Sequence, residues 1–217
     1  MILKERYRSV IGYFQAHGPE PETELEYTDP FELIVAVILS AQCTDKRVNI
    51  ITPPLLAAFP DAASMAKASP EEIFEYIRSC SYPNNKAKHL SGMAKMVHEK
   101  FGGRIPDDPE ILQQLPGVGR KTANVVASVI YNKPVMAVDT HVFRVSKRIG
   151  LTPRARNPRE TERILTENIP AGLIHNAHHW LILHGRYVCI ARNPKCGVCG
   201  IKEFCRYYTS GKIKKKV

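Results

Sequence analysis

The sequence predicts an all-α fold. Helix-start signals recur along its 217 residues, apolar residues recur at spacings of three and four, and no segment alternates apolar and polar residues as a half-buried strand would. A hydrophobic content of 44% and a charged content of 24% are ordinary for a globular chain of one or two domains. We therefore expect helices packed around a conventional core.

Four predicted helices start with a side-chain acceptor at the cap and proline at the first helical position. The four starts are Asp29-Pro30, Ser69-Pro70, Asp108-Pro109 and Asn157-Pro158. Glu follows three residues after the cap at all of them except Asp108, and this spacing predicts capping boxes.

The segments that follow these starts have the periodicity of helices. Residues 31–42, FELIVAVILSAQ, are apolar nearly all round, which is typical of a helix buried in a core. Residues 71–80 and 87–101 repeat apolar side chains at helical spacing. Short separators between helices are expected at Pro53-Pro54, Gly102-Gly103 and Pro153.

Residues 115–122, LPGVGRKT, have the composition of a phosphate-binding loop. A Walker loop would need a strand followed by Gly-Lys-Ser/Thr, whereas here Arg120 separates Gly119 from Lys121 and the preceding PEILQQL has helical spacing. The segment therefore predicts a helix, a tight Pro-Gly-x-Gly turn and a second helix, RKTANVVASVIY. Amide groups at the start of that second helix can bind a phosphate, and an ordinary interhelical turn is the alternative.

The net charge of +10 is concentrated toward the C-terminus. Residues 1–133 hold 15 Lys and Arg against 16 Asp and Glu, and residues 134–217 hold 16 against 5. This distribution favours a polyanionic partner, with a solubilising surface and a Lys-rich tail as the alternative. The N-terminus lacks the pattern of a secretory signal, and the longest apolar run, residues 33–39, is too short to span a bilayer. We expect a cytoplasmic protein without a membrane partner.

Four cysteines near the C-terminus have the spacing of a metal-binding loop. In CIARNPKCGVCGIKEFC, six, two and five residues separate Cys189, Cys196, Cys199 and Cys205. Four thiolates in so short a segment can hold one metal centre. Structural zinc sites commonly use two Cys-x-x-Cys pairs and this segment has one, so zinc is disfavoured but stays an alternative.

Three features together resemble a known superfamily. LPGVGRKTA, the aspartate Asp139 in VMAVDTHVFRV and the cysteine spacing are similar to the helix-hairpin-helix DNA glycosylases, in the iron-sulfur branch that includes endonuclease III and the adenine mismatch glycosylases. The resemblance implies a [4Fe-4S] cluster on the four cysteines and a two-lobed all-α fold. A six-helix lobe with the hairpin is expected over residues 29–133, and an iron-sulfur cluster lobe over residues 1–28 plus 134–217.

The resemblance also implies a reaction. The chain is expected to be a bifunctional DNA glycosylase and abasic-site (AP) lyase of base excision repair that removes oxidised pyrimidines from duplex DNA. Lys121 is expected to attack C1′ of the damaged nucleotide and form a Schiff base, after which β-elimination cuts the strand; Asp139 is expected to stabilise positive charge on the sugar. Adenine mismatch enzymes usually lack this lysine. A monofunctional mismatch glycosylase and a non-catalytic DNA-binding protein are the alternatives.

Further DNA contacts follow from the resemblance by position. The expected contacts are Gln42, Tyr82, Gly117, Gly119, Arg120, Thr122 and His141. Gln42 and Tyr82 are expected to fill the gap left by the flipped base, although Tyr82 and Pro83 replace the aliphatic wedge and aromatic residue common in the family. A buried structural tyrosine is the alternative at position 82.

Other polar residues receive simpler interpretations. A monovalent cation is expected at hairpin carbonyls, by position those of Gln113, Leu115 and Val118. Cys43 and Cys80 are expected to be core thiols. Packing roles are favoured for His175, His178 and His179. Basic side chains around the cysteine loop are expected to lie against DNA phosphates, with charges that balance the cluster or are solvated as the alternative: Arg186, Arg192, Lys195, Lys202 and Arg206. We expect a monomer, associated with the nucleoid in a prokaryote.

Overall fold

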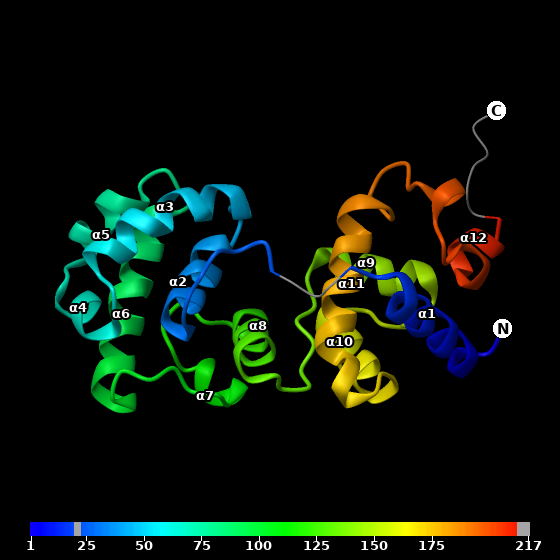
Figure 1. Ribbon diagram of the computed structural model, residues 1–217, viewed down its shortest axis with the longest axis horizontal. Coiled ribbons are helices and arrows are strands. Elements are labelled where there is room, and N and C mark those ends of the chain that lie inside the picture. Colours follow the sequence, from blue (N-terminus) through cyan, green and yellow to red (C-terminus); the bar gives the residue numbers. More distant parts are fainter. Residues whose placement is uncertain (20–22, 212–217) are drawn as a thin grey trace. The chain divides into compact units, whose positions relative to one another are not determined.

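The computed structural model describes residues 1–19 and 23–211, and the regular elements of those residues are all helices, without a strand (Figure 1). The prediction of an all-α fold is confirmed. The chain divides into two compact units, residues 23–132 and residues 1–22 with 133–217, which we call the central unit and the terminal unit.

The central unit contains seven α-helices among its described residues. They are α2 (Pro30–Ser40), α3 (Asp45–Ala58), α4 (Ala62–Lys67), α5 (Pro70–Ile77), α6 (Pro83–Phe101), α7 (Pro109–Leu112) and α8 (Arg120–Tyr131). The longest, α6, packs against α4 and α5, while α2 packs against α3 and α8. The buried helix α2 therefore supports the helix that carries the RKT segment.

The terminal unit is built from both ends of the chain. Its helices are α1 (Leu3–His17), α9 (Thr140–Ile149), α10 (Pro158–Asn168), α11 (Ile174–Tyr187) and α12 (Arg206–Thr209), with 3-10 turns η1 (Ala171–Leu173), η2 (Cys196–Val198) and η3 (Lys202–Phe204). The Phe14 ring of α1 stacks on Trp180 of α11 with ring centroids 5.9 Å apart. The indole Nε1 of Trp180 donates to the Pro19 carbonyl at 3.0 Å, so α1 is fastened to the C-terminal part of the chain.

One of the three predicted capping boxes is complete. At the start of α5, the amide of Glu72 donates to Ser69 Oγ at 3.2 Å and the amide of Ser69 donates to Glu72 Oε2 at 2.8 Å. Both bonds of the motif are present, and each satisfies an amide that the helix itself leaves without an acceptor.

In each of the other two predicted boxes, one of the two hydrogen bonds is absent, so these predictions are wrong in part. Asp29 caps α2 by accepting from the Glu32 amide at 2.9 Å, but the Glu32 carboxylate accepts from the amide of Thr28 rather than from that of Asp29. Asn157 and Glu160 repeat this arrangement at α10, where Glu160 accepts from the amide of the residue before the cap. In both cases the glutamate carboxylate accepts from the amide one residue before the cap, and the cap amide does not receive the second bond of the box.

The expected separator at Pro53-Pro54 is also wrong, because both prolines lie inside α3. Proline lacks the amide hydrogen of the helical bond and normally disrupts a helix interior. Here Val48, Ile51 and Leu55 on the same helix are buried, and this burial holds the helix together through the prolines. The separator predicted at Gly102-Gly103 is present: the two glycines have positive φ angles of 59° and 81° and end α6.

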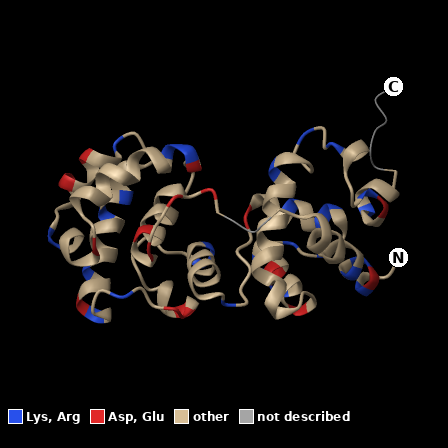
Figure 2. Cartoon of the chain, in the orientation of Figure 1, with Lys and Arg blue, Asp and Glu red and all other residues tan. Residues whose placement is uncertain are grey.

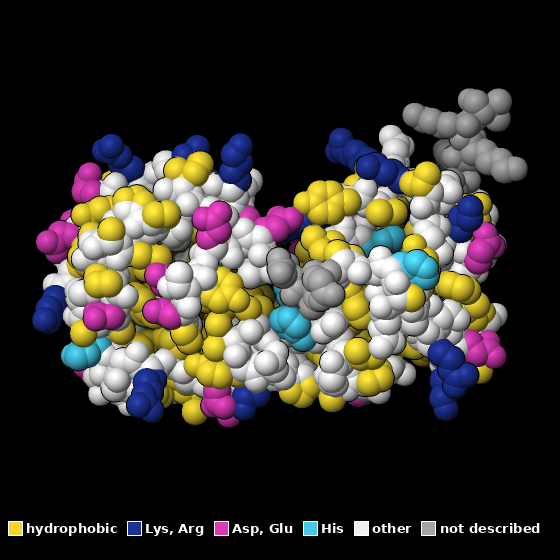
Figure 3. All heavy atoms as spheres, in the orientation of Figure 1, with side chains coloured by type: hydrophobic (Ala, Val, Ile, Leu, Met, Phe, Trp, Pro, Cys, Tyr) yellow, Lys and Arg dark blue, Asp and Glu magenta, His cyan; other side chains and the backbone are white. Residues whose placement is uncertain are grey.

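Charge is divided unevenly between the two units (Figure 2). The central unit holds 11 Lys and Arg against 13 Asp and Glu, and the terminal unit holds 20 against 8. On the face drawn in Figure 3, acidic and basic side chains are interspersed over the central unit. The excess positive charge therefore belongs to the unit that contains the cysteine loop.

Within the described ranges, none of the helices combines the length and the apolar character that a membrane crossing requires.

Candidate active site and metal centre

The hairpin turn between α7 and α8 is shaped by its first glycine. Leu115 and Val118 are buried beneath the turn, and the Val118 amide donates to the Leu115 carbonyl at 3.0 Å. Gly117 has a φ of +80°, in the left-handed region that favours glycine. A Cβ at this position would also lie 2.7 Å from the Cβ of His89. Gly117 is therefore required by the turn itself.

The second glycine of the turn is not required by packing. Gly119 is the N-cap of α8 with a φ of −84°, and a Cβ added to it would meet no atom within 4 Å. No side chain caps the start of α8. Glycine at this position therefore leaves the beginning of the helix open to close approach by a ligand, where the backbone carries partial positive charge.

The first turn of α8 presents the basic residues predicted from the sequence. Lys121 and Arg120 are exposed, and Thr122 is half-buried. Arg120 Nη1 lies 3.8 Å from Glu110 Oε1, and both side chains are largely exposed, so this ion pair adds little stability. The lysine side chain is accessible to a reactant from solvent.

Asp139 begins helix α9 and is held at both carboxylate oxygens. Its Oδ1 accepts from the Val142 amide at 2.7 Å, and its Oδ2 lies 2.9 Å from His141 Nδ1. The His141 nitrogen acts as the donor because an ionised carboxylate can only accept. The Asp139 side chain is 15% exposed, so the carboxylate is fixed in position and still reachable.

A close helix contact fixes the backbone that carries His141. A Cβ on Gly185 of α11 would lie 2.9 Å from His141 Cβ and 3.0 Å from Val145 Cγ2. Glycine at this point allows α9 and α11 to pack closely. The first turn of α9, which carries Asp139 at its cap, is therefore supported from α11.

The two residues predicted to enter the DNA gap share an unusual backbone. Gln42 and Tyr82 both have a φ of +55°, which is uncommon for residues other than glycine. Gln42 is exposed and Tyr82 is 62% exposed, so the alternative of a buried structural tyrosine is wrong. Ser81 Oγ donates to the Gln42 carbonyl at 2.7 Å and links the two loops. Pro83 occupies the first position of α6 directly after Tyr82.

The sequence reasoning missed a buried lysine beside these loops. The Lys86 ammonium donates to the carbonyls of Leu39 at 2.8 Å and Ala41 at 2.7 Å, and lies 3.2 Å from Cys80 Sγ. Cys80 is buried, as expected for a core thiol, whereas Cys43 is only half-buried. Burial raises the pKa of the Cys80 thiol, so its sulfur keeps the proton that it directs at the Leu39 carbonyl.

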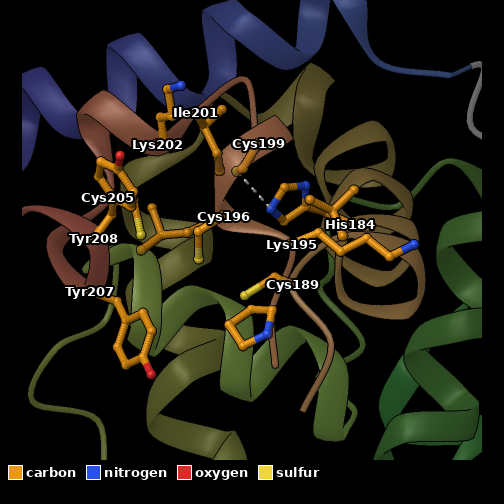
Figure 4. Close-up of a pocket in the computed structure, with 13 residues that line it drawn as sticks. His184, Cys189, Lys195, Cys196, Cys199, Ile201, Lys202, Cys205, Tyr207 and Tyr208 are labelled. Atoms are coloured by element: carbon orange, nitrogen blue, oxygen red, sulfur yellow. Dashed lines mark hydrogen bonds between the residues drawn. The ribbon is translucent and has the colours of Figure 1, made fainter. Parts of the chain in front are cut away.

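The four clustered cysteines line one pocket in the terminal unit (Figure 4). Burial raises the pKa of the Cys199 thiol to about 11. Burial is also the largest cause that raises the pKa of Cys196 and Cys205, and negative charge on Cys189 adds to the rise at both. Four thiolates here are unfavourable without positive ions between them, so the donor set fits a metal centre.

The four cysteines come from one short segment of the chain. Among the described residues, no group of three His, Cys, Asp or Glu side chains lies close enough together to hold one metal ion.

Two arginines of α9 hold the cysteine loop and were not predicted from the sequence. Arg148 donates through Nη1 to the Ile190 carbonyl and through Nη2 to the Ala191 carbonyl, both at 2.8 Å. Arg144 donates through Nε to the Cys189 carbonyl at 3.3 Å. The helix that starts at Asp139 is thus connected by hydrogen bonds to the beginning of the cysteine loop.

The remaining polar residues lie around this loop and along α11. Three of the basic residues expected to face DNA are exposed and two are half-buried: Arg192, Lys195 and Arg206, then Arg186 and Lys202. His178 and His179 are buried, and the ring of His179 lies 5.2 Å from that of His178 and 4.8 Å from that of His175. These ring contacts are typical of packing.

Two family models match the chain. Residues 35–171 match the HhH-GPD superfamily of base excision DNA repair proteins. Residues 189–205, from the first to the last cysteine of the loop, match the iron-sulfur binding domain of endonuclease III.

Named relatives are similar over nearly their full lengths. Endonuclease III of Rickettsia felis is 46% identical over 206 residues, which are 95% of this chain and 96% of the relative. Endonuclease III of Escherichia coli K12 is 41% identical over 204 residues, 94% of this chain and 96% of the relative.

Solved structures agree with these relatives. A trapped endonuclease III–DNA covalent intermediate has a TM-score of 0.90 at 39% identity and covers 97% of this chain and 99% of that one. A non-covalent endonuclease III–DNA complex has a TM-score of 0.90 at 38% identity, with 97% and 98% covered. A thermostable thymine-DNA glycosylase, at 22% identity and a TM-score of 0.82, shares the fold.

Fold and hairpin together define a helix-hairpin-helix DNA repair protein. The chain belongs to the endonuclease III family, and the predicted resemblance is confirmed. Its cofactor is a [4Fe-4S] cluster, as the sequence predicted, and its partner is DNA.

Proposed function

We propose that Lys121 is the nucleophile and Asp139 the charge-stabilising carboxylate of this chain, which is a bifunctional DNA glycosylase and AP lyase of base excision repair. The observation that carries the assignment is the exposed Lys121 side chain in the first turn of α8, where Gly119 leaves the helix start open. A structurally similar endonuclease III has been trapped in covalent linkage to DNA, and such linkage requires a nucleophile on the protein.

The lysine must lose its proton before it can attack. A lysine amine with the reference pKa of about 10.4 is almost entirely protonated at neutral pH, so the attack requires removal of a proton. The Lys121 amine then bonds to C1′ as the bond to the base breaks, and the base leaves with the bonding electrons and takes up a proton. Ring opening gives a Schiff base. Loss of a proton from C2′ then breaks the C3′–O bond, and water finally releases the lysine.

Asp139 would act on the charge that develops during this reaction. Departure of the base leaves positive charge on the sugar, and a fixed carboxylate stabilises it without reorganisation at the moment of reaction. The bonds from the Val142 amide and His141 hold the carboxylate in place. An oxygen that faces the sugar can also carry protons between steps.

The hairpin would hold the DNA backbone near the reacting sugar. Backbone groups at Gly117 and Gly119 can approach a phosphate closely, and Arg120 and Thr122 lie within the first turn that follows. Hairpin carbonyls, by position those of Gln113, Leu115 and Val118, would hold a monovalent cation against the same phosphate. His141 would contact a second phosphate from the start of α9.

Gln42 and Tyr82 would fill the space left by the flipped nucleotide. A base inside a duplex cannot be reached by the lysine, so it has to leave the stack. An exposed aromatic ring such as Tyr82 can stack on neighbouring bases and compensate for the lost stacking.

The four cysteines of the loop would be the ligands of the cluster. When bound, the cluster supplies the positive ions that four neighbouring thiolates need. The Arg144 and Arg148 hydrogen bonds then fasten the loop to α9. Exposed Arg192 and Lys195 on this loop would meet DNA phosphates.

The preferred substrate is duplex DNA with an oxidised pyrimidine, and the protein acts as a monomer. The test is an assay of end-labelled duplexes that contain either an oxidised pyrimidine or an adenine mismatch, analysed with and without alkali. We expect strand cleavage at the oxidised pyrimidine before alkali is added. Base release that becomes visible as cleavage only after alkali would establish a monofunctional glycosylase instead.

Size-exclusion chromatography with light scattering tests the monomer, which predicts a mass near 24.4 kDa. A dimer mass at the concentrations used for the assay would contradict this part of the proposal.

A further inference from the structure

Lys86 is a buried lysine that has no role in the reaction proposed above. It lies in the first turn of α6, four residues after Tyr82, and is only 5% exposed. Burial of an ammonium group is costly unless hydrogen bonds replace its water. The Lys86 ammonium has such bonds to the carbonyls of Leu39 and Ala41, at 2.8 and 2.7 Å.

Those carbonyls belong to the end of α2. The last carbonyls of a helix receive no hydrogen bond from an amide of the helix and carry partial negative charge, so an ammonium group there is well placed. Ala41 is the C-cap of α2, and the next residue, Gln42, adopts its left-handed conformation at once. Lys86 therefore fixes the chain on the immediate N-terminal side of Gln42.

A second bond fixes the other side of Gln42. The Ser81 hydroxyl donates to the Gln42 carbonyl at 2.7 Å, and Ser81 directly precedes Tyr82. Gln42 and Tyr82 are two of the four non-glycine residues with positive φ among the described residues. Gln42 therefore has a backbone bond from Lys86 on the residue before it and a bond from Ser81 on its own carbonyl, and Ser81 is the neighbour of the second residue with a positive φ, Tyr82.

We infer that Lys86 is a positioning residue that holds Gln42 and Tyr82 as a pair, in the arrangement in which both enter the gap left by the flipped base. The inference rests on the gap-filling role proposed above for these two side chains. Lys86 touches neither the sugar nor the base; it acts through the backbone of the loop that follows α2.

Loss of Lys86 is expected to affect two substrates of the same enzyme differently. A damaged base must be unstacked from the duplex before release, and filling the gap favours that step. An existing abasic site has no base to unstack, so its cleavage depends less on the pair. Loss of Lys86 should reduce base release much more than abasic-site cleavage, whereas a general structural defect would reduce both.

The first test is K86M, which keeps the length of the side chain and removes the ammonium. We expect kcat/KM for release of an oxidised pyrimidine to fall about 10- to 100-fold, because small displacements of a positioned group can have effects of this size. Cleavage of a preformed abasic duplex should stay within about threefold of wild type. The matched control is K88M, which removes an exposed lysine from the same helix and should leave both rates unchanged. Equal losses on the two substrates, or no loss on either, would overturn the inference.

A milder variant keeps the inference testable if K86M does not fold. S81A removes the hydroxyl that bonds the Gln42 carbonyl and leaves Lys86 intact. We expect a loss of about three- to tenfold in base release, with little change in abasic-site cleavage and thermal stability. Unchanged base release in S81A together with an unfolded K86M would show that Lys86 is needed for folding alone.

A binding measurement separates this inference from the proposed chemistry. A fluorescent adenine analogue opposite the lesion reports unstacking in duplex DNA bound to K121Q protein, where no Schiff base can form. The fluorescence rise should be present with K121Q and strongly reduced with the K86M/K121Q double variant. A rise with K121Q but no strand cleavage by wild type would reject the lyase proposal and not the role of Lys86. An equal rise with both variants would reject the role of Lys86.

Discussion

The starts of α8 and α9 carry the two residues proposed for the reaction, and they are built in opposite ways. At α9, Asp139 caps the helix with its own side chain and both carboxylate oxygens are held by hydrogen bonds. At α8, Gly119 provides no cap, a Cβ there would meet nothing, and Lys121 is exposed. The capped start fixes a charge in place, while the open start leaves backbone and lysine accessible to a ligand.

The largest expected effect comes from removing the lysine at the open start. K121Q should lower strand cleavage by about 10³-fold or more, because loss of a covalent nucleophile removes the reaction path itself. DNA binding should change by less than about tenfold, since the hairpin backbone is intact. Cleavage of an abasic duplex and fluorescence anisotropy of the same duplex measure the two quantities.

A matched lysine provides the control for K121Q. Lys46 is exposed and occupies the second position of α3, as Lys121 does in α8, but Thr44 caps α3 with its side chain. K46Q should retain strand cleavage. A comparable loss in K46Q would mean that the assay reports positive charge at a helix start rather than a nucleophile.

The next effect comes from neutralising the capped start. D139N should lower base release by about 10²- to 10³-fold, the range found when a group that stabilises transition-state charge is lost. The melting temperature should stay near that of wild type, because Asn caps helices about as well as Asp. Single-turnover base release and thermal unfolding measure these outcomes.

Two further variants separate charge from capping. D139A removes both and should also destabilise the protein by about 1 kcal/mol. D29N changes the cap of α2 in the same way as D139N changes that of α9, and it should leave base release unchanged. If D139N retained wild-type base release, the carboxylate of Asp139 would be a cap and nothing more.

The third prediction tests whether the cysteine loop supports the capped start. C199A should lose the visible absorption of the cluster and loosen the loop that Arg144 and Arg148 bind. Hydrogen exchange in α9 should then accelerate about 10- to 100-fold, while exchange in α8, which belongs to the central unit, should change little. C43A, outside the loop, is the control. Equal acceleration in both helices would contradict a local support for α9.

The smallest effect comes from the two glycines of the hairpin. G119A should lower DNA affinity about three- to tenfold with little loss of stability, since the added methyl group occupies open space beside the helix start. G117A should instead lower stability by about 1 to 3 kcal/mol, because its φ of +80° and the contact with His89 both disfavour alanine. Equal effects of the two variants on melting temperature would remove the distinction between a structural and a ligand-facing glycine.

Most of the correct predictions about the fold came from sequence signals only a few residues long. Proline after a capping residue marked the starts of α2, α5, α7 and α10, because capping chemistry is decided within four residues. The same local reasoning was wrong at Pro53-Pro54, where buried neighbours on α3 keep the helix intact. It was also wrong about one bond in each of two capping boxes, because the glutamate carboxylate accepts from the amide before the cap and the sequence does not distinguish these two neighbouring amides.

Long-range contacts could not be predicted from the pattern. Lys86 bonds a carbonyl 47 residues earlier, and Arg148 bonds carbonyls 42 and 43 residues later. Both look in sequence like ordinary basic residues on helices, because no periodicity records which carbonyl they reach. The exposure of Tyr82 was likewise known only from the structure, because the sequence does not distinguish a buried tyrosine from an exposed one.

Covalent trapping with borohydride tests the central claim most directly. Wild-type protein is mixed with duplex DNA that contains an oxidised pyrimidine, borohydride reduces any Schiff base, and peptide mapping by mass spectrometry locates the adduct. We predict one adduct, on Lys121, which is absent in K121Q and retained in K46Q. No adduct from wild-type protein, an equal adduct from K121Q, or an adduct on another residue would contradict the assignment of the open start of α8 as the source of the nucleophile.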